Sequence, residues 1–420
     1  MKVHKRWTQL AAVFGTAALA LAGCAGGSGT TTESSSTGAD SGAAAGSVVI
    51  GTTLPLTGPL QAFGTSLELG YQKAIDEVNA AGGLELDGEM VQIELAVMDN
   101  ASDGNTGAEQ ARELVLDSGA VALLGPATPP ITIPVSVAAE QLEVPLISTI
   151  TPLRAWMGAN EEGWQWSWDI FFDELQMTQT QFQAADLIDT NKKVALFTDL
   201  EEDGVVMGGL WEMQAPELGY EVVYRGEFPV GNTNFTAQVQ EARESGAEVV
   251  IAQVIPPDGV SLLREMKAQG WAPKAVFLEK AGNTGGYPTI SEGLADGVMA
   301  ANWFAEGIGT SQEADFIAEF AESLGGINSD LGCVVYGYTA AKVLLDAMAA
   351  AGTADAAAVN EAIGATNADY PAGQVSFDDA HASAMPAVQT QWVGNDMVLV
   401  MNADGSAGSN AVSSPPAGLQ

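Results

Sequence analysis

Side chains that could carry out catalysis are few in this sequence. Its 420 residues include two His and two Cys. His381 stands among residues 378–383 with no Cys or Ser motif beside it, which is typical of a solvated loop, and His4 lies in a leader described below. The GxSxG, GxxxxGK, GxGxxG and HExxH patterns do not occur. The sequence therefore gives little support to an enzyme.

The acidic residues of positions 199–204 resemble part of a calcium loop. Asp199, Glu201 and Asp203 alternate before Gly204. An EF-hand loop needs a Glu at its twelfth position, and Leu210 stands there. We interpret these acids as a solvated or cleft-facing turn, and we expect no metal ion and no cofactor.

Four Trp lie close together in the chain, at Trp156, Trp164, Trp166 and Trp168. The last three alternate, so in a strand they would share one face. Two interpretations stay open: an aromatic wall packed against helices, or a surface that contacts a ligand.

The charge balance excludes several functions. The chain has 15 Lys and Arg against 53 Asp and Glu, a formal net charge of -38. Phosphate backbones and anionic lipid surfaces would repel such a chain, so we expect no nucleic-acid partner. The apolar content of 47% is nevertheless that of a globular protein.

The first residues have the pattern of an export signal. Lys2, Lys5 and Arg6 precede an apolar run at residues 10–22, which is too short to span a bilayer. The Leu-Ala-Gly-Cys sequence that ends at Cys24 resembles a bacterial lipobox, which implies a signal peptide at 1–23 and a diacylglycerol group on Cys24. Residues 24–47 are rich in Gly, Ser, Thr and Ala, so we expect a flexible tether. We find no later apolar stretch of about 18 residues that would span a membrane.

Cys333 is the only other thiol. If Cys24 carries lipid, no disulfide can form within the chain. Cys333 lies in the mostly apolar run 331–335, which favours a buried position.

Short apolar runs alternate with amphipathic stretches along the body of the chain. Strands are predicted at 48–53, 91–98, 121–124, 144–148, 194–198, 220–224, 249–254 and 275–278. Helices are predicted at 67–78, 108–115, 134–141, 176–188, 207–218, 235–245 and 259–269. This alternation indicates an α/β fold of two doubly wound lobes with parallel sheets. Ligands bind at the carboxyl ends of strands in such sheets, so we expect a cleft lined by both lobes.

Several segments together resemble a known family. They are residues 51–64 (GTTLPLTGPLQAFG), 74–83 (AIDEVNAAGG), 99–103, 124–126, 144–151, 262–270 and 336–342. The chain resembles the leucine/isoleucine/valine-binding substrate-binding proteins of ATP-driven importers.

This resemblance implies a type I periplasmic binding protein fold, in which three crossovers join the two lobes. We place the crossovers near Trp168, at 300–303 and at 373–377. Lobe one is then 48–168 plus 303–372, and lobe two is 169–302 plus 373–401. Residues 402–420 have a composition similar to that of the tether, and we expect a disordered tail.

The resemblance also implies a set of ligand contacts. The matching positions are Phe63, Ala127, Thr128, Ser148, Thr151, Asp203 and Glu279. Phe63 would pack on the ligand's side chain, and the next four residues would face its carboxylate. Pro129 stands where the family has a carboxylate-binding Ser, and Asp203 replaces an aromatic residue. Glu279 would pair with an amine, unless a register shift of one residue puts Lys280 there.

The function implied is an extracytoplasmic, lipid-anchored receptor for an amino acid or a related small polar metabolite. Its partners would be the permease and ATPase subunits of an ABC importer. Two alternatives stay open: a sensory receptor that reports ligand to a membrane signalling partner, and a hydrolase that uses cleft carboxylates such as Asp203 and Glu279.

Overall fold

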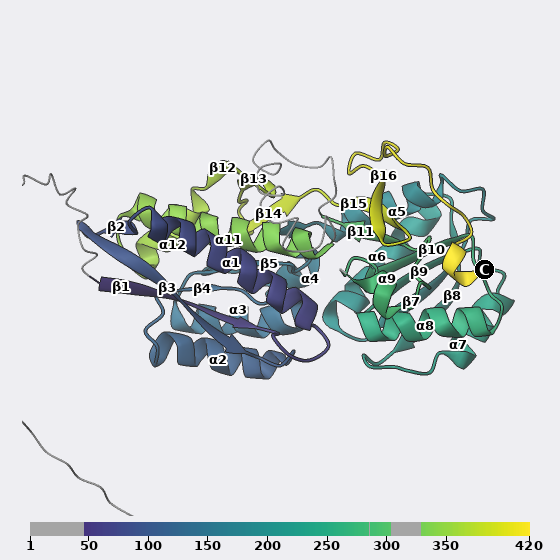
Figure 1. Ribbon diagram of the computed structural model, residues 1–420, viewed down its shortest axis with the longest axis horizontal. Coiled ribbons are helices and arrows are strands. Elements are labelled where there is room, and N and C mark those ends of the chain that lie inside the picture. Colours follow the sequence, from purple (N-terminus) through teal and green to yellow (C-terminus); the bar gives the residue numbers. More distant parts are fainter. Residues whose placement is uncertain (1–45, 285, 304–328) are drawn as a thin grey trace, which may run out of the picture. The chain divides into compact units, whose positions relative to one another are not determined.

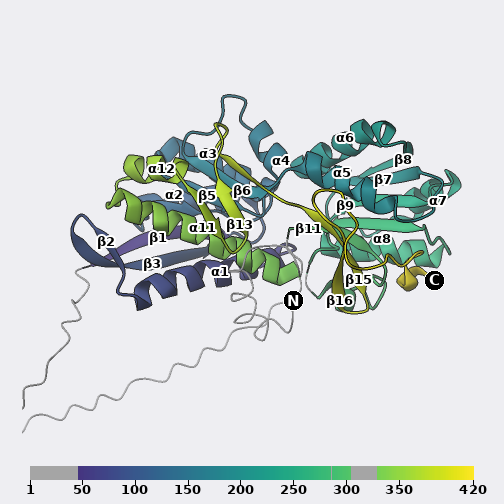
Figure 2. The same ribbon diagram turned by 90° about the horizontal axis from the view of Figure 1, so that it is seen from above.

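The computed structural model describes residues 46–284, 286–303 and 329–420 of the chain. The predicted signal peptide 1–23, the predicted lipidation site Cys24 and nearly all of the predicted tether lie outside the described residues. The two sheets and their helices are drawn in Figures 1 and 2.

The first sheet has seven strands in the order β14-β6-β5-β4-β1-β3-β2. Its strands are β1 (Gly46–Leu54), β2 (Leu84–Leu86), β3 (Glu89–Asp99), β4 (Ala122–Leu124), β5 (Leu146–Thr149), β6 (Ser167–Phe172) and β14 (Ala382–Met385). All neighbouring pairs are parallel except β2 and β3. This is the doubly wound arrangement predicted for lobe one.

Helices cover both faces of the first sheet. They are α1 (Gln61–Ala80), α2 (Gly104–Leu116), α3 (Pro129–Leu142), α4 (Leu153–Gly158), α11 (Ser329–Ala351) and α12 (Ala356–Gly364). Figure 1 shows α2 and α3 on one face and α1 and α11 on the other. Leu67, Tyr71 and Ile75 form the buried stripe of α1. At Gly70 a Cβ atom would lie 2.4 Å from the carbonyl oxygen of Val334, so a glycine lets α1 and α11 approach closely.

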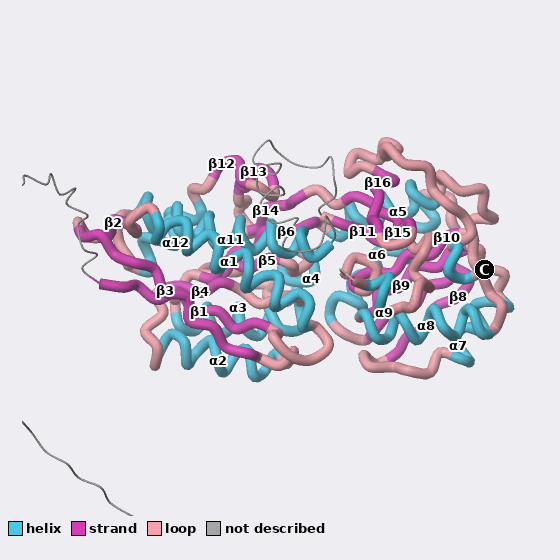
Figure 3. Tube along the Cα trace, in the orientation of Figure 1, coloured by secondary structure: helices cyan, strands magenta, loops and turns pink. Residues whose placement is uncertain are grey.

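The second sheet also has seven strands, in the order β16-β15-β11-β10-β9-β7-β8. They are β7 (Lys193–Asp199), β8 (Glu221–Phe228), β9 (Val249–Val254), β10 (Ala275–Lys280), β11 (Met299–Asn302), β15 (Val388–Val393) and β16 (Asp396–Met401). The helices beside it are α5 (Glu174–Ala185), α6 (Glu202–Glu217), α7 (Thr236–Glu244), α8 (Pro256–Ala268) and α9 (Tyr287–Ile290). In Figure 3 the helices α7 and α8 lie on one face, and α5 and α6 on the other. Two sheets whose central strands are parallel, each flanked by helices, confirm the predicted α/β fold class.

The chain passes between the sheets at positions that differ from the predicted ones. Strand β6 continues to Phe172, four residues beyond the crossover predicted at Trp168. The third crossover was placed at 373–377, but β13 (Gly373–Ser376) forms a hairpin with β12 (Asn367–Tyr370). The next strand, β14, pairs with β6 in the first sheet, so the passage to β15 comes after Met385. Strands β13 and β14 are each four residues long, which is too short to give a clear periodicity in the sequence.

The prediction of a disordered tail at 402–420 is wrong. Lys267 donates a hydrogen bond from Nζ to the carbonyl oxygen of Gly418 at 2.8 Å, and Gln391 binds the backbone of Ser413. Leu419 is 4% exposed and belongs to the apolar core around α7 and α8. Small residues allow this close packing: a Cβ on Gly418 would lie 2.3 Å from the carbonyl oxygen of Leu294. The composition resembles a tether, but the segment packs on the second sheet.

Helix α11 corrects the expectation that no apolar stretch after the leader is long enough to span a membrane. Its residues Leu331–Ala351 have a mean hydropathy of 1.2 and are long and apolar enough to cross a membrane. The helix is mostly buried within the protein and packs on α1, which is the setting of a core helix. Cys333 lies on it and is buried, as predicted.

The Trp residues do not form one strand face. Strand β6 begins only at Ser167. Trp164 instead stacks on Trp156 with ring centroids 5.2 Å apart. Trp168 stacks on His381 at 3.5 Å, which makes this His a packed, half-buried side chain rather than a solvated one. Most of these Trp side chains therefore pack within the layers of the first sheet.

Candidate functional site

A pocket lies where the carboxyl ends of strands from both sheets meet their following loops. Its lining residues are Phe63, Thr128, Pro129, Ile150, Pro152, Phe171, Phe172, Met177, Asp203, Met207, Gln253, Glu279, Lys280, Asn283 and Trp303. The cavity has a volume of about 40 Å³. Pockets for small molecules have volumes of roughly 300 Å³ or more, so this cavity is small for a metabolite.

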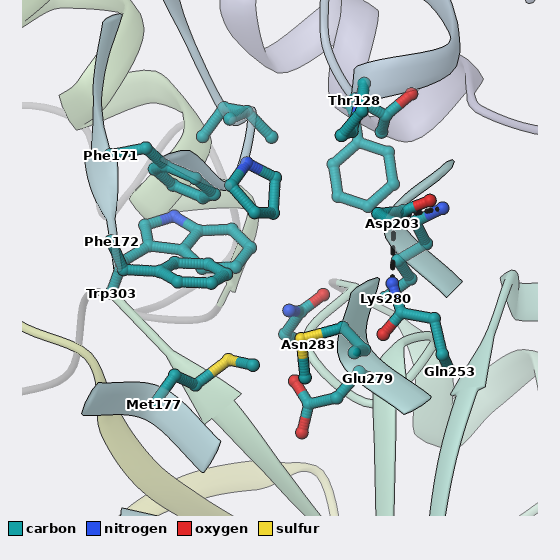
Figure 4. Close-up of a pocket in the computed structure, with 15 residues that line it drawn as sticks. Thr128, Phe171, Phe172, Met177, Asp203, Gln253, Glu279, Lys280, Asn283 and Trp303 are labelled. Atoms are coloured by element: carbon teal, nitrogen blue, oxygen red, sulfur yellow. Dashed lines mark hydrogen bonds and ion pairs between the residues drawn. The ribbon is translucent and has the colours of Figure 1, made fainter. Parts of the chain in front are cut away.

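The two walls of the pocket differ in chemistry. Figure 4 shows the rings of Phe171, Phe172 and Trp303 together on one side. The labelled polar side chains Asp203 and Lys280 lie on the opposite side. A ligand between them would have an apolar surface against the rings and polar groups toward the second sheet.

Asp203, Lys280 and Asp199 form a buried ionic cluster on the polar wall. The ammonium nitrogen of Lys280 lies 2.6 Å from Asp203 Oδ2 and 3.9 Å from Asp199 Oδ2. Gln253 also donates a hydrogen bond to Asp203 Oδ2 at 2.8 Å. The approach of α6 to the end of β7 requires Gly204, where a Cβ would lie 2.2 Å from Asp199 Oδ1.

The environment shifts the pKa values of these groups. Burial raises the pKa of Asp199 to about 7, although the Lys280 ammonium opposes this shift. Burial alone would lower the pKa of Lys280, but attraction to Asp203 and then Asp199 outweighs it and raises the pKa above its ordinary value. Lys280 is therefore charged at neutral pH and serves as the counter-ion of Asp203.

Glu279 is held by the chain's own donors. Its Oε1 atom accepts hydrogen bonds from Gln181 Nε2 at 2.5 Å and from the Ala301 backbone N–H at 3.0 Å. Trp211 in turn donates to Gln181 Oε1 at 2.6 Å. Burial raises the pKa of Glu279 to about 7.

Glu279 and Lys280, the two alternatives for the amine-pairing position, both line the pocket. Side chains alternate along a strand, so two neighbours would ordinarily face opposite ways. Lys280 ends β10 with φ of 60°, in the left-handed region that costs energy for a residue other than glycine. The turn of the backbone at this position brings both side chains to one site.

Thr128 contributes a hydroxyl without a partner. Its φ is 69°, and its Oγ1 atom is buried with no hydrogen-bond partner among the described residues. The Thr128 N–H donates to the carbonyl oxygen of Ile150, so only the hydroxyl remains for a ligand. Pro129 lines the pocket as well and has no N–H to offer.

Three predicted contacts do not line the pocket. Ala127 is fully buried beneath it. Ser148 donates to Asp169 Oδ1 at 3.0 Å and to the Trp168 carbonyl, and the Thr151 hydroxyl lies 2.8 Å from that of Thr132. The hydroxyl groups of Ser148 and Thr151 thus bind neighbouring strands and loops.

Other lining residues were not predicted from the sequence. They are Ile150, Pro152, Phe171, Phe172, Met177, Met207, Gln253, Asn283 and Trp303. Asn283 Oδ1 and Trp303 Nε1 are buried without hydrogen-bond partners in the described structure. Phe171 and Phe172 end a strand, which is the one sequence signal that could have identified them.

No metal site accompanies this pocket in the described part of the chain. No group of three or more His, Cys, Asp or Glu side chains is arranged there to hold a metal ion. Of the acids at 199–203, Asp199 and Asp203 belong to the ionic cluster with Lys280.

Residues 47–396 match the family described as periplasmic binding protein. The chain belongs to this family. A "Leu/Ile/Val-binding protein homolog 8" of Brucella abortus is 27% identical over 67% of this chain and 70% of its own length. The family assigns the chain a solute-binding role outside the cytoplasm.

Solved structures support the same fold. A branched-chain amino acid transporter substrate-binding protein from Streptococcus pneumoniae, in complex with isoleucine, has a TM-score of 0.73 and 21% identity. The match covers 84% of this chain and 97% of that one. A solute-binding protein from R. palustris in complex with 4-hydroxybenzoate has a TM-score of 0.68 and 18% identity over 88% of this chain and 96% of its own.

Proposed function

We propose that this protein binds an amino acid or a related small polar metabolite in the described pocket and delivers it to an ABC importer. The observation that carries the proposal is a set of buried polar atoms without partners on residues that line one cavity. They are Thr128 Oγ1, Asp203 Oδ1, Asn283 Oδ1 and Trp303 Nε1. Buried polar groups are almost always hydrogen-bonded in proteins, so such a cluster favours a ligand that supplies the missing partners.

Phe63, Thr128, Asp203 and Glu279 are the predicted contacts that we propose for the ligand site. Ala127, Ser148 and Thr151 would then position the loops of the first sheet. The small cavity volume supports a cleft that opens to take up its solute and closes over it. Closure of two lobes is a motion by which a receptor can signal occupancy to a permease.

The pocket favours binding over catalysis. A hydrolase that uses cleft carboxylates would need one of them free to act as base or nucleophile. Asp203 is paired with Lys280, and Glu279 accepts two hydrogen bonds from the chain. We therefore propose that the ligand leaves the cleft chemically unchanged.

A thermal-unfolding screen tests this function. The protein is stripped of endogenous ligand by unfolding and refolding, and is then heated with single amino acids, amines, amides and carboxylic acids at 10 mM. A ligand that binds tighter than about 1 mM stabilises the folded state by more than about 1 kcal/mol at this concentration. We expect at least one compound to raise the melting temperature; if none does, the proposed function is wrong.

We also propose that a lipid on Cys24 anchors the protein to the outer face of the cell membrane, with residues 24–47 as a tether. The lipobox-like sequence before Cys24 supports this proposal. Replacing Cys24→Ser should move the protein from the membrane fraction to the soluble fraction. Retention in the membrane fraction would mean that something other than this lipid holds it.

A further inference from the structure

The first wall of the pocket has few groups that could hold a carboxylate. Helix α3 begins beside the cavity with Pro129 and Pro130, which have no N–H. The next two N–H groups, of Ile131 and Thr132, donate to the carbonyl oxygen of Thr128. A helix N-terminus is ordinarily an anion site because its first N–H groups are free. In α3 those donors are absent or engaged, and the Thr128 hydroxyl is the donor left at this position.

The opposite wall has more carboxyl groups than cations. Asp199, Asp203 and Glu279 are all buried, and Lys280 is the one cation within ion-pair distance of them among the described residues. Lys280 is committed to the two aspartates, so Glu279 has hydrogen bonds but no positive partner. A carboxylate bound at Lys280 would lie beside Asp203 and Asp199, and the like charges would repel it.

The aromatic wall is suited to the apolar body of a ligand. Phe171 and Trp303 pack with ring centroids 4.7 Å apart, and Phe172 stacks nearly parallel to Trp303 at 5.9 Å. Such rings can bury the apolar surface of a ligand and leave its charged group to the polar wall. Figure 4 shows this aromatic group across the cavity from Glu279.

We infer that the ligand is an organic cation without a carboxylate, an amine on an aromatic or branched aliphatic body, whose ammonium group pairs with Glu279. This inference rests on the proposed solute-binding function and names the class of solute. It selects amines from the broader group of amino acids and related metabolites. Pro129 and Lys280 are the residues that exclude the amino acid itself: the first removes donors for its carboxylate, and the second is engaged with the acids.

The test compares compounds that share one body and differ only in their polar group. Titration calorimetry at pH 8 uses 3-methylbutylamine, leucine, 4-methylpentanoate and 4-methylpentanamide, and then phenethylamine, phenylalanine and 3-phenylpropionate. We expect an amine to bind at least tenfold tighter than its matched amino acid, acid or amide. Tighter binding by an amino acid, an acid or an amide overturns the inference and leaves the proposed function intact.

Two variants assign the preference to residues. Glu279→Gln keeps a hydrogen-bond acceptor but removes the charge, and should weaken amine binding at least tenfold. Glu202→Gln, an exposed position on α6 outside the pocket lining, removes the same charge and should change affinity by less than twofold. Equal effects of the two substitutions would show that the general negative field attracts the amine, and would overturn the pairing with Glu279.

Pro129→Ser provides an independent gain of function. It restores an N–H and a hydroxyl at the first turn of α3, where proline and serine are both compatible with the backbone. The variant should bind leucine or phenylalanine at least tenfold tighter than the wild type does. An unchanged amino-acid affinity in a folded variant would contradict the role given to Pro129. If no compound of the full screen binds the wild type, the proposed function itself fails.

Discussion

Glu279 is a buried carboxyl group whose ionisation costs folding free energy. Burial raises its pKa from 4.5 to about 7, so the folded state binds this proton more tightly than the unfolded state does. Through this group the protein loses stability as the pH rises from about 4.5 to 7, and the full cost is present above pH 7.

Glu279→Gln should therefore stabilise the ligand-free protein at pH 8, by up to about 3 kcal/mol, because the amide keeps the acceptor without the charge. The difference should shrink toward zero near pH 4.5. Urea unfolding at several pH values measures both, with the exposed Glu202→Gln as the control. A stabilisation independent of pH would show that the charge is not its cause.

Phe63 lies on α1 with its side chain at the pocket, 3% exposed. Phe63→Ala removes apolar surface from the first wall, so ligand affinity should fall at least tenfold. Asp99→Ala should leave affinity within threefold. The Asp99 carboxylate accepts hydrogen bonds from Leu56 and Thr57 and lies outside the pocket lining. If both variants bind as the wild type does, Phe63 is not a ligand contact.

The resemblance to the leucine/isoleucine/valine-binding proteins indicated some of the pocket residues. Phe63, Thr128, Asp203 and Glu279 were carried over from it and do line the cavity. Ser148 was not separable from them, because its strand position does not reveal that its hydroxyl turns toward Asp169. The aromatic wall was missed because it is assembled by tertiary packing from β6 and the residue after β11.

Long secondary-structure elements were predicted more accurately than short ones. Strands such as β7 and β9 and helices such as α8 are long enough to show a clear hydrophobic periodicity. Their predicted bounds lie within a few residues of the observed ones. Strands β13 and β14 have four residues each, and their pairing depends on distant partners. The third crossover was therefore placed too early.

The C-terminal segment shows that composition alone can mislead. Its residues are small and polar, yet Leu419 enters the core of the second sheet's helices. Leu419→Ala should cost about 2 kcal/mol of unfolding free energy. Leu116→Ala, at a side chain that is 68% exposed, should cost less than about 0.5 kcal/mol. Equal small effects in urea unfolding would mean that the segment detaches in solution.

The net charge of -38 acts on the whole molecule. Carboxylates outnumber cations more than threefold, so the surrounding field attracts positive solutes and repels anions at low ionic strength. This field is screened within roughly 8 Å at physiological salt. We therefore expect discrimination among solutes to come from the buried pocket, which Lys280 and Glu279 line.

A crystal structure with bound solute tests the central claim most directly. The compound that raises the melting temperature most would be co-crystallised with the ligand-stripped protein. We predict that it lies between Phe63 and Glu279, in contact with residues that follow strands of both sheets. Density for the solute elsewhere, for instance in the groove between α11 and α12 that Asp346 and Tyr370 line, would contradict the account.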